Sequence, residues 1–169
     1  LSSYPSILSL HSYMKDFKKR IQFISNWVRT ASKPIVFDLG AFFHPDEFLS
    51  GIFQIFSRKH GVSYDSLHWK TTPVDSDADQ ISNEPSEGVY ISGLPLEGAK
   101  WDIGRQYLVE CGAKELSNSL PVMHLVPTQN ANIYDMKETY ECPVYRTQKR
   151  GTGALDLQNY VLSLFLPTP

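Results

Sequence analysis

Apolar residues recur every three or four positions from Ser9 to about Thr30, and this spacing predicts a long amphipathic helix. Polar residues at positions 15, 18, 19 and 22 are expected to point away from the apolar stripe. The stripe consists of Leu10, Met14, Phe17, Ile21, Ile24 and Trp27.

A second helix is predicted from Pro45 to about His60. Pro45 suits the first helical position, Asp46 and Glu47 complement the positive start of a helix, and the basic residues 58–60 complement its end. Gly61 is expected to end the helix as a left-handed cap. The apolar face is so wide that we expect burial on more than one side; it comprises Phe48, Leu49, Ile52, Phe53, Ile55 and Phe56.

After Gly61 the pattern changes to short β-rich runs separated by turn residues. This spacing favours a small antiparallel barrel or sandwich over a parallel βαβ sheet. We therefore predict an α+β fold, with a helical lead-in over residues 1–61 and a small antiparallel β-barrel over residues 62–169. The expected strands are 67–74, 88–96, 107–110, 121–126, 141–147 and 159–166, with a β-like run at 35–39 between the helices and an acidic surface loop at 75–87.

The composition excludes some classes of function. A formal net charge of -2 gives no long-range field suited to nucleic acid or an anionic membrane, so we expect neither partner. No apolar run approaches the ~18 residues that would span a bilayer. Cys111 and Cys142 are expected to be free thiols in a reducing compartment rather than a disulfide. The sequence opens on Leu1 rather than Met, which suggests a segment of a longer protein.

Gly93 and Gly98 have the spacing of a phosphate-binding loop, but the residues that would carry the chemistry do not match. Lysine must directly follow the second glycine and a hydroxyl must follow the lysine, whereas Ala99 comes first here and Trp101 follows Lys100. A proline inside the loop also removes one backbone donor. We therefore predict a strand, a tight turn and a second strand anchored by Trp101, with no bound nucleotide.

Other reactive residues form no recognisable site. The acidic positions 75, 77 and 79 imitate an EF-hand, but Gln80 and Ser86 stand where glycine and a bidentate glutamate are needed. His44 is expected at the entrance of the second helix and His124 on the outer face of a strand. None of the histidines pairs with another on one helix, and neither cysteine lies near one, which disfavours zinc; they are His11, His44, His60, His68 and His124. There is no nucleophile elbow, and Cys142 suits a structural thiol, so no catalytic, cofactor-binding or metal residue is predicted.

Several ordered blocks of the sequence are similar to one known family. The pattern G-V-Y-I…G-L-x-L-E-G-A-x-W-D is met by residues 88–102, and Y-E-C-P-V-Y-x-T by residues 140–147. The other matching residues are Phe17, Arg20, Phe23 and Trp27; Phe37, Leu39, Phe42, Phe43, Pro45, Phe48 and Leu49; Arg58, Lys59, Asp65 and Leu67; and Leu120, Pro121, Val122, Leu125 and Pro127. Over nearly its whole length the sequence resembles the C-terminal domain of dynein heavy chains, more closely the axonemal than the cytoplasmic branch.

The resemblance implies a helical lead-in followed by a small β-barrel that lies against a ring of ATPase modules and modulates the motor. It implies no cofactor and no nucleotide in this domain. Microtubules would be bound only by other parts of the parent motor, in the cytoskeleton and most specifically in the axoneme of a cilium or flagellum. Asp38 and Ala41 depart from the family, which usually has Trp and Gly there, so the packing of that strand is expected to differ.

The leading hypothesis is a non-catalytic regulatory module that braces the ATPase ring of the same heavy chain. The helix over residues 45–60 would dock, and Gly93, Gly98 and Trp101 would shape the barrel turn. The alternative is a free-standing adaptor that binds a peptide or a light chain, with the basic face of the first helix at Lys18 and Lys19 as the exposed patch. That basic run is otherwise a solvated helix face. An enzyme would need a convergent set of titratable groups that the sequence does not show.

Overall fold

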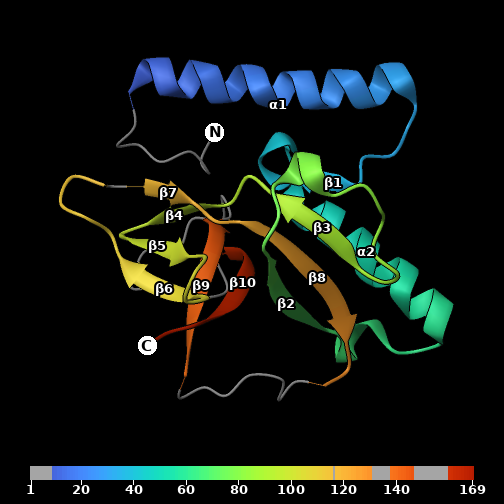
Figure 1. Cartoon of the computed structure of the whole chain (residues 1–169). Coiled ribbons are helices and arrows are strands. Elements are labelled where there is room, and N and C mark those ends of the chain that lie inside the picture. The colour runs from blue at the N-terminus through green and yellow to red at the C-terminus, as the bar shows by residue number, and fades with distance from the viewer. Residues whose placement is uncertain (1–8, 116, 131–137, 147–159) are drawn as a thin grey trace.

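The computed structural model describes residues 9–115, 117–130, 138–146 and 160–169, and it contains two long helices followed by β-strands (Figure 1). α1 (Leu10–Thr30) lies across one end of the molecule, and α2 (Pro45–His60) runs beside the largest sheet. Strand β1 (Val36–Asp38) and the 3-10 turn η1 (Leu39–Ala41) connect the two helices. The prediction of an α+β fold with two N-terminal helices is confirmed.

The ends of both helices follow from local chemistry. The Ser9 hydroxyl caps α1 by accepting a hydrogen bond from the backbone N–H of Ser12 at 3.3 Å. Ala31 ends α1 in the left-handed conformation, with φ of 51°. Pro45 begins α2 and Gly61, with φ of 64°, ends it, as the sequence predicts.

The largest sheet has four strands in the order β1-β3-β8-β2. Strand β3 (Val89–Ser92) pairs in parallel with β1 and antiparallel with β8 (Val122–Thr128), which pairs antiparallel with β2 (His68–Val74). Short 3-10 turns, η2 (Tyr64–Ser66) and η3 (Ala78–Gln80), flank β2. The sheet is therefore mixed, because β1 comes from the helical lead-in.

Three further sheets have two antiparallel strands each. They pair β4 (Pro95–Glu97) with β7 (Ser117–Ser119), β5 (Ala99–Asp102) with β6 (Tyr107–Glu110), and β9 (Thr139–Arg146) with β10 (Tyr160–Pro167). The six strands expected after Gly61 are confirmed, although the run at 88–96 divides into β3 and β4 at Gly93; residues 147 and 159 lie outside the described ones.

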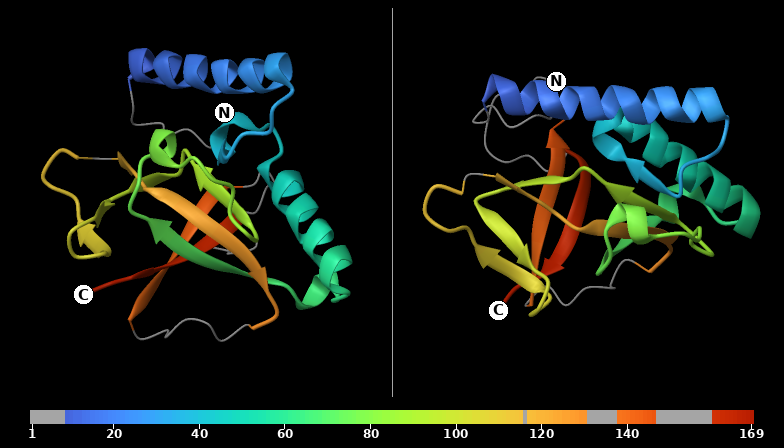
Figure 2. Two further views of the ribbon diagram at one scale, coloured as in Figure 1. Left: turned by 45° about the vertical axis from the view of Figure 1, so that its right-hand side comes forward. Right: turned by 45° about the horizontal axis from the view of Figure 1, so that its top comes forward.

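The prediction of a small antiparallel β-barrel needs correction. Within the described ranges the strands form four separate sheets, none of them closed, and one of them contains a parallel pair. Gly93 and Gly98, both with φ of 76°, end β3 and β4 after a few residues, so no ladder continues around the molecule (Figure 2).

One hydrophobic core joins the helices to the strands. Ile91 of β3, Leu125 of β8 and Leu164 of β10 are fully buried in the same cluster, which also includes Phe37 and Leu49. The proposed division at residue 61 remains a prediction, although core residues come from both sides of it. Neither helix in the described part of the chain is long and apolar enough to cross a membrane.

Helix α2 is buried along one side, not on more than one as its wide apolar face predicts. Leu49 is its buried residue, whereas Ile55 is exposed. The remaining apolar residues are partly covered by the strands and by aromatic residues nearby. This helix therefore shields the core on one side and presents its other side to solvent.

Candidate functional site

The segment from Gly88 to Asp102 does not form a phosphate site. Lys100 lies within β5, and its ammonium group pairs with Glu115 at 3.5 Å. Gly93 packs so closely against Asp38 that a Cβ atom at this position would overlap the carboxylate oxygen Oδ1. A carboxylate beside the first glycine repels phosphate, and no helix follows the turn to add N–H donors within the described segment. The segment folds into three short strands, β3, β4 and β5, with turns at Gly93 and Gly98, rather than the predicted two strands and one turn.

Trp101 anchors this turn against the domain, as predicted. Its ring packs against the hydrophobic cluster, while Gly98 turns β4 into β5 with open space around it. Within the described ranges, no acceptor lies within hydrogen-bond distance of the buried indole Nε1. The part played by Trp101 is therefore apolar packing.

A polar cluster ties α1 to the loop after β1. Arg20 donates from Nη1 to the carbonyl oxygen of Gly40 at 2.6 Å, and its Nε pairs with Asp16 at 2.6 Å. The backbone N–H of Gly40 donates to Asp38 Oδ1 at 3.1 Å. Asp38 is only 6% exposed, and burial raises its pKa even though Lys19 and Arg20 oppose the shift. The loop is therefore held from two sides, by a guanidinium and by a buried carboxyl group.

Aromatic packing fixes the same end of α1. The Trp27 ring lies 5.5 Å from Phe37 and 6.2 Å from Phe42, both edge-on, and Phe42 stacks on Phe48 at 4.5 Å. This cluster joins α1, β1 and α2. It uses most of the aromatic residues that match the family, whereas Phe17 and Phe43 are exposed.

The phenylalanines of α2 are largely used within the domain. Phe53 stacks on Trp69 at 4.2 Å and meets Tyr64 edge-on at 5.7 Å. The exposed apolar side chains of this region are Phe43, just before the helix, and Ile55. Docking through residues 45–60 stays a prediction, and the exposed Ile55 is available for it, whereas the phenylalanine rings of the helix are packed within the domain.

Glu87 joins the end of α2 to the sheet, a link that the sequence pattern does not reveal. Its Oε1 lies 2.9 Å from His60 Nε2 and 3.4 Å from Lys59 Nζ. Its carbonyl oxygen lies 2.9 Å from His124 Nε2, whose ring packs on Tyr90. His124 lies on the face of β8 opposite the buried Met123 and Leu125, as expected, and it is half-buried there beside Glu87.

The other candidate residues do not converge. Within the described ranges, no group of three His, Cys, Asp or Glu side chains could hold a metal ion. Asp77 caps η3 together with Gln80, and Asp75 accepts a hydrogen bond from Gln106 at 2.6 Å, so both carboxylates are used in contacts within the domain. His44 stands at the start of α2 without a capping hydrogen bond from its side chain.

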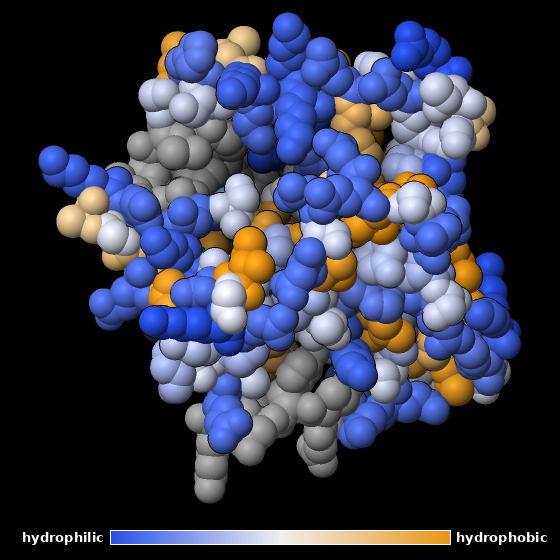
Figure 3. Space-filling model, viewed as in Figure 1, coloured by the Kyte–Doolittle hydropathy of each residue, from blue (hydrophilic) through white to orange (hydrophobic). Residues whose placement is uncertain are grey.

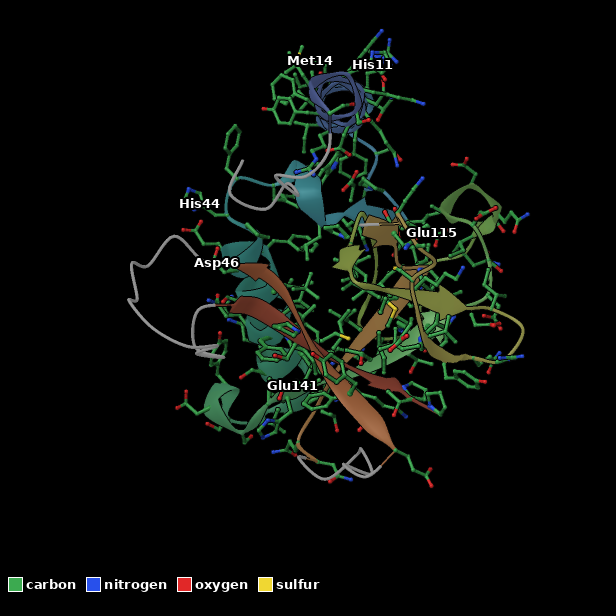
Figure 4. All side chains as sticks on the ribbon, turned by 90° about the vertical axis from the view of Figure 1, so that its left-hand side faces the viewer. His11, Met14, His44, Asp46, Glu115 and Glu141 are labelled. Carbon is green, nitrogen blue, oxygen red and sulfur yellow. The ribbon has the colours of Figure 1, made fainter. Side chains whose placement is uncertain are left out.

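Both cysteines are free, as predicted, and neither is placed as a nucleophile. Burial raises the pKa of the Cys142 thiol to about 11, which keeps it protonated near neutral pH. Cys111 Sγ accepts a hydrogen bond from Asn118 Nδ2 at 2.9 Å. In the described part of the protein no catalytic site is evident, and the structure is an α+β domain with two helices packed on one core (Figure 4).

Comparison with known proteins identifies the family. A family model for the C-terminal domain of dynein heavy chains matches residues 1–169. The sequence is 37% identical to dynein axonemal heavy chain 12 of Homo sapiens over 170 residues, which is 98% of its own length and 5% of that protein. It is 35% identical to dynein axonemal heavy chain 1 of Homo sapiens, with 98% and 4% covered. It is 34% identical to the ciliary dynein beta chain of Tripneustes gratilla, with 88% and 3% covered.

The protein therefore belongs to the family of C-terminal domains of dynein heavy chains, and its relatives named above are axonemal or ciliary heavy chains. The resemblance inferred from the sequence blocks is confirmed. The 169 residues span only 3% to 5% of the length of these relatives.

Proposed function

We propose that this domain is a non-catalytic regulatory and structural module of an axonemal-type dynein heavy chain, and that it braces the ATPase ring of the same polypeptide. The observation that supports this proposal best is the match of all 169 residues to one family, with axonemal and ciliary heavy chains among its relatives. The module acts in the cilium or flagellum, and other parts of the motor bind the microtubule.

The packing of the domain suits a brace. α1 and α2 are fixed on the same core by the Trp27 aromatic cluster, and Arg20 adds a polar link to the loop after β1. Interiors packed in this way transmit displacement with little deformation. Phe43 and Ile55 add exposed apolar surface that a neighbouring module would cover.

The proposal is tested on the complete heavy chain, with and without residues 1–169. Removal of the domain should change the microtubule-stimulated ATPase rate and the gliding velocity. Unchanged values for both would refute a regulatory role. In a separate titration calorimetry experiment, the 169-residue domain should show no Mg-ATP binding, and micromolar affinity would refute its non-catalytic character.

The alternative, an adaptor for a peptide or light chain, is favoured by one observation. Lys15, Lys18 and Lys19 are all exposed on α1, and this basic face is available to an acidic partner. Capture of a defined light chain that is lost on charge reversal of Lys18 and Lys19 would favour the adaptor. A complete heavy chain that depends on the domain for normal ATPase activity would favour the brace.

A further inference from the structure

The first five residues of the predicted stripe on α1, together with Val28, form a line that the rest of the described domain leaves largely exposed. Its residues are spaced by four, three, four, three and four positions, which is the heptad pattern of a helix that packs along another helix. No residue of α1 is fully buried. We call these residues the outer seam: Leu10, Met14, Phe17, Ile21, Ile24 and Val28.

The exposure of the outer seam is high along its length. Leu10 is 75% exposed, Met14 53%, Phe17 40%, Ile21 49% and Val28 77%, while Ile24 is half-buried. Single exposed apolar residues are common on proteins, but a continuous line of them marks an interaction surface. Met14, Phe17 and Ile21 line an open stretch of surface along the middle of the seam, together with neighbouring polar residues of the same helix.

The outer seam and the anchoring residues lie on different sides of the same helix. Arg20, Phe23 and Trp27 face the domain, where they contact Gly40 and the aromatic cluster. At 100° per residue, the centre of the seam lies about 80–140° around the helix from them. In the view along α1, Met14 and His11 lie on the upper side of the helix, away from the strands (Figure 4). The part of α1 that faces the viewer in Figure 3 is hydrophilic.

The charges beside the outer seam specify the partner. His11, Lys15 and Lys18 are exposed on one flank of the seam, and His11 and Lys18 occupy the heptad position that borders it. In coiled coils, residues at this position pair with opposite charges on the partner helix. A partner helix with Asp or Glu along the facing flank would complement this side.

A second copy of this domain is a poor occupant by the same reasoning. In a symmetric antiparallel pair of α1 helices, Lys18 would face Lys18 of the other copy near the centre, and like charges at such sites are unfavourable. A helix elsewhere in the same polypeptide avoids this repulsion. It would also be present at a high effective concentration, because the two segments are covalently linked.

We propose that an amphipathic α-helix from another part of the same heavy chain packs along the outer seam, with its apolar heptad positions against Met14, Phe17 and Ile21 and its acidic flank beside Lys18. This inference rests on the proposed function, since it requires the domain to be part of a complete heavy chain. Helix α1 is then the element through which the domain is held, with one face on its own core and the other on the motor.

Photo-crosslinking in the complete heavy chain tests the proposal. Benzoylphenylalanine at Ile21 samples the outer seam, and the same group at Asn26, exposed on the opposite side of α1, is the matched control. Peptide mapping should find the Ile21 product within the same polypeptide, on a helix with heptad apolar residues and neighbouring Asp or Glu. The Asn26 product should not map to that helix.

Two variants sharpen the result. With the probe at Ile21, Met14→Asp should lower the crosslink yield about tenfold, because it places a charge in an apolar contact. Lys18→Glu should also lower the yield, and changing the facing acid on the mapped helix to lysine should restore it. Crosslinks to a second copy, to a different polypeptide or to nothing would overturn the proposal, as would a yield unaffected by Met14→Asp.

The crosslinking result and the test of the proposed function can fail independently. If deletion of the domain alters the ATPase rate but Ile21 gives no intramolecular product, the regulatory role stands and the outer-seam inference fails. If Ile21 gives the expected product but deletion leaves the ATPase rate and gliding velocity unchanged, the docking stands and the regulatory role fails.

Discussion

Replacing Gly93 with alanine tests whether the buried Asp38 carboxyl group fixes the turn between β3 and β4. Gly93 has φ of 76°, and the space that a Cβ atom would need is already occupied by Asp38 Oδ1. Asp38 cannot move aside freely, because it is buried and accepts the hydrogen bond from the N–H of Gly40. The substitution therefore strains the backbone and displaces the carboxyl group.

The backbone strain and the displaced carboxyl group each lower the free energy of unfolding. A left-handed conformation costs an alanine about 1–2 kcal/mol relative to glycine. Loss of a hydrogen bond to a charged group adds about 1.5–3 kcal/mol. Gly93→Ala should thus lower the free energy of unfolding by roughly 2.5–5 kcal/mol, which is the sum of these terms. Gly98 provides the matched control, since it has the same φ of 76° but nothing within 4 Å of the position that an added methyl group would take. Gly98→Ala should lower the free energy of unfolding by only about 1–2 kcal/mol.

Urea denaturation followed by tryptophan fluorescence measures these differences, and a double-mutant cycle tests their cause. Once Gly93→Ala has displaced the carboxyl group, adding Asp38→Ala should cost little more. The coupling between the two substitutions should be at least about 1.5 kcal/mol. Additive effects, or equal losses for Gly93→Ala and Gly98→Ala, would show that Asp38 does not set the geometry of this turn.

Three further predictions concern the same region and α1. Burial raises the pKa of Asp38, so this carboxyl group favours folding below its ordinary pKa of 3.8, and its contribution to stability is lost as the pH rises through the folded-state pKa. Asp38→Asn should therefore have a higher melting temperature than the parent at pH 7. The difference in melting temperature should shrink on acidification towards pH 3.8. Trp27→Ala should lower the free energy of unfolding, measured by urea denaturation, by about 3–5 kcal/mol and should speed hydrogen exchange in α1. Val28→Ala, at an exposed position, should change the free energy of unfolding by no more than about 0.5 kcal/mol. Similar losses for both variants would refute the anchoring role of Trp27. Ala31→Gly should stabilise the domain by about 1 kcal/mol, because Ala31 adopts φ of 51° at the end of α1, and a lower melting temperature would contradict this.

The helices could be predicted well because their signals are local. The start of α2 depends on Pro45 and its end on Gly61, which are adjacent to the structure they determine. Strand β7 has no such signal, since Ser117, Asn118 and Ser119 show no apolar alternation and are recruited as a strand by pairing with β4. A sequence pattern therefore reveals a strand or helix that buries its own apolar residues more readily than a strand that forms only by pairing with another strand.

The contacts between distant segments could not be predicted from the sequence. The parallel pairing of β1 with β3 joins Val36 to Tyr90, and the close approach of Asp38 to Gly93 follows from that register. Asp38 could be recognised as a departure from the family, but its burial depends on the parallel pairing. The hypothesis of a closed barrel fails for the same reason, because strand spacing alone does not determine which edges meet.

The outer seam shows how one periodic pattern can contain two interfaces. The sequence pattern places Trp27 on the same stripe as Leu10 and Met14, but in the structure Trp27 faces the core while the other two residues remain exposed. A helix of 21 residues is about 31 Å long, and the residues that pack it on the described core, Arg20 to Trp27, cover only about 10 Å of that length. In proteins most of the stability of a helix comes from the packing of its apolar face on other segments. The length of α1 beyond its anchor is therefore best explained if a second surface packs against the outer seam and stabilises it.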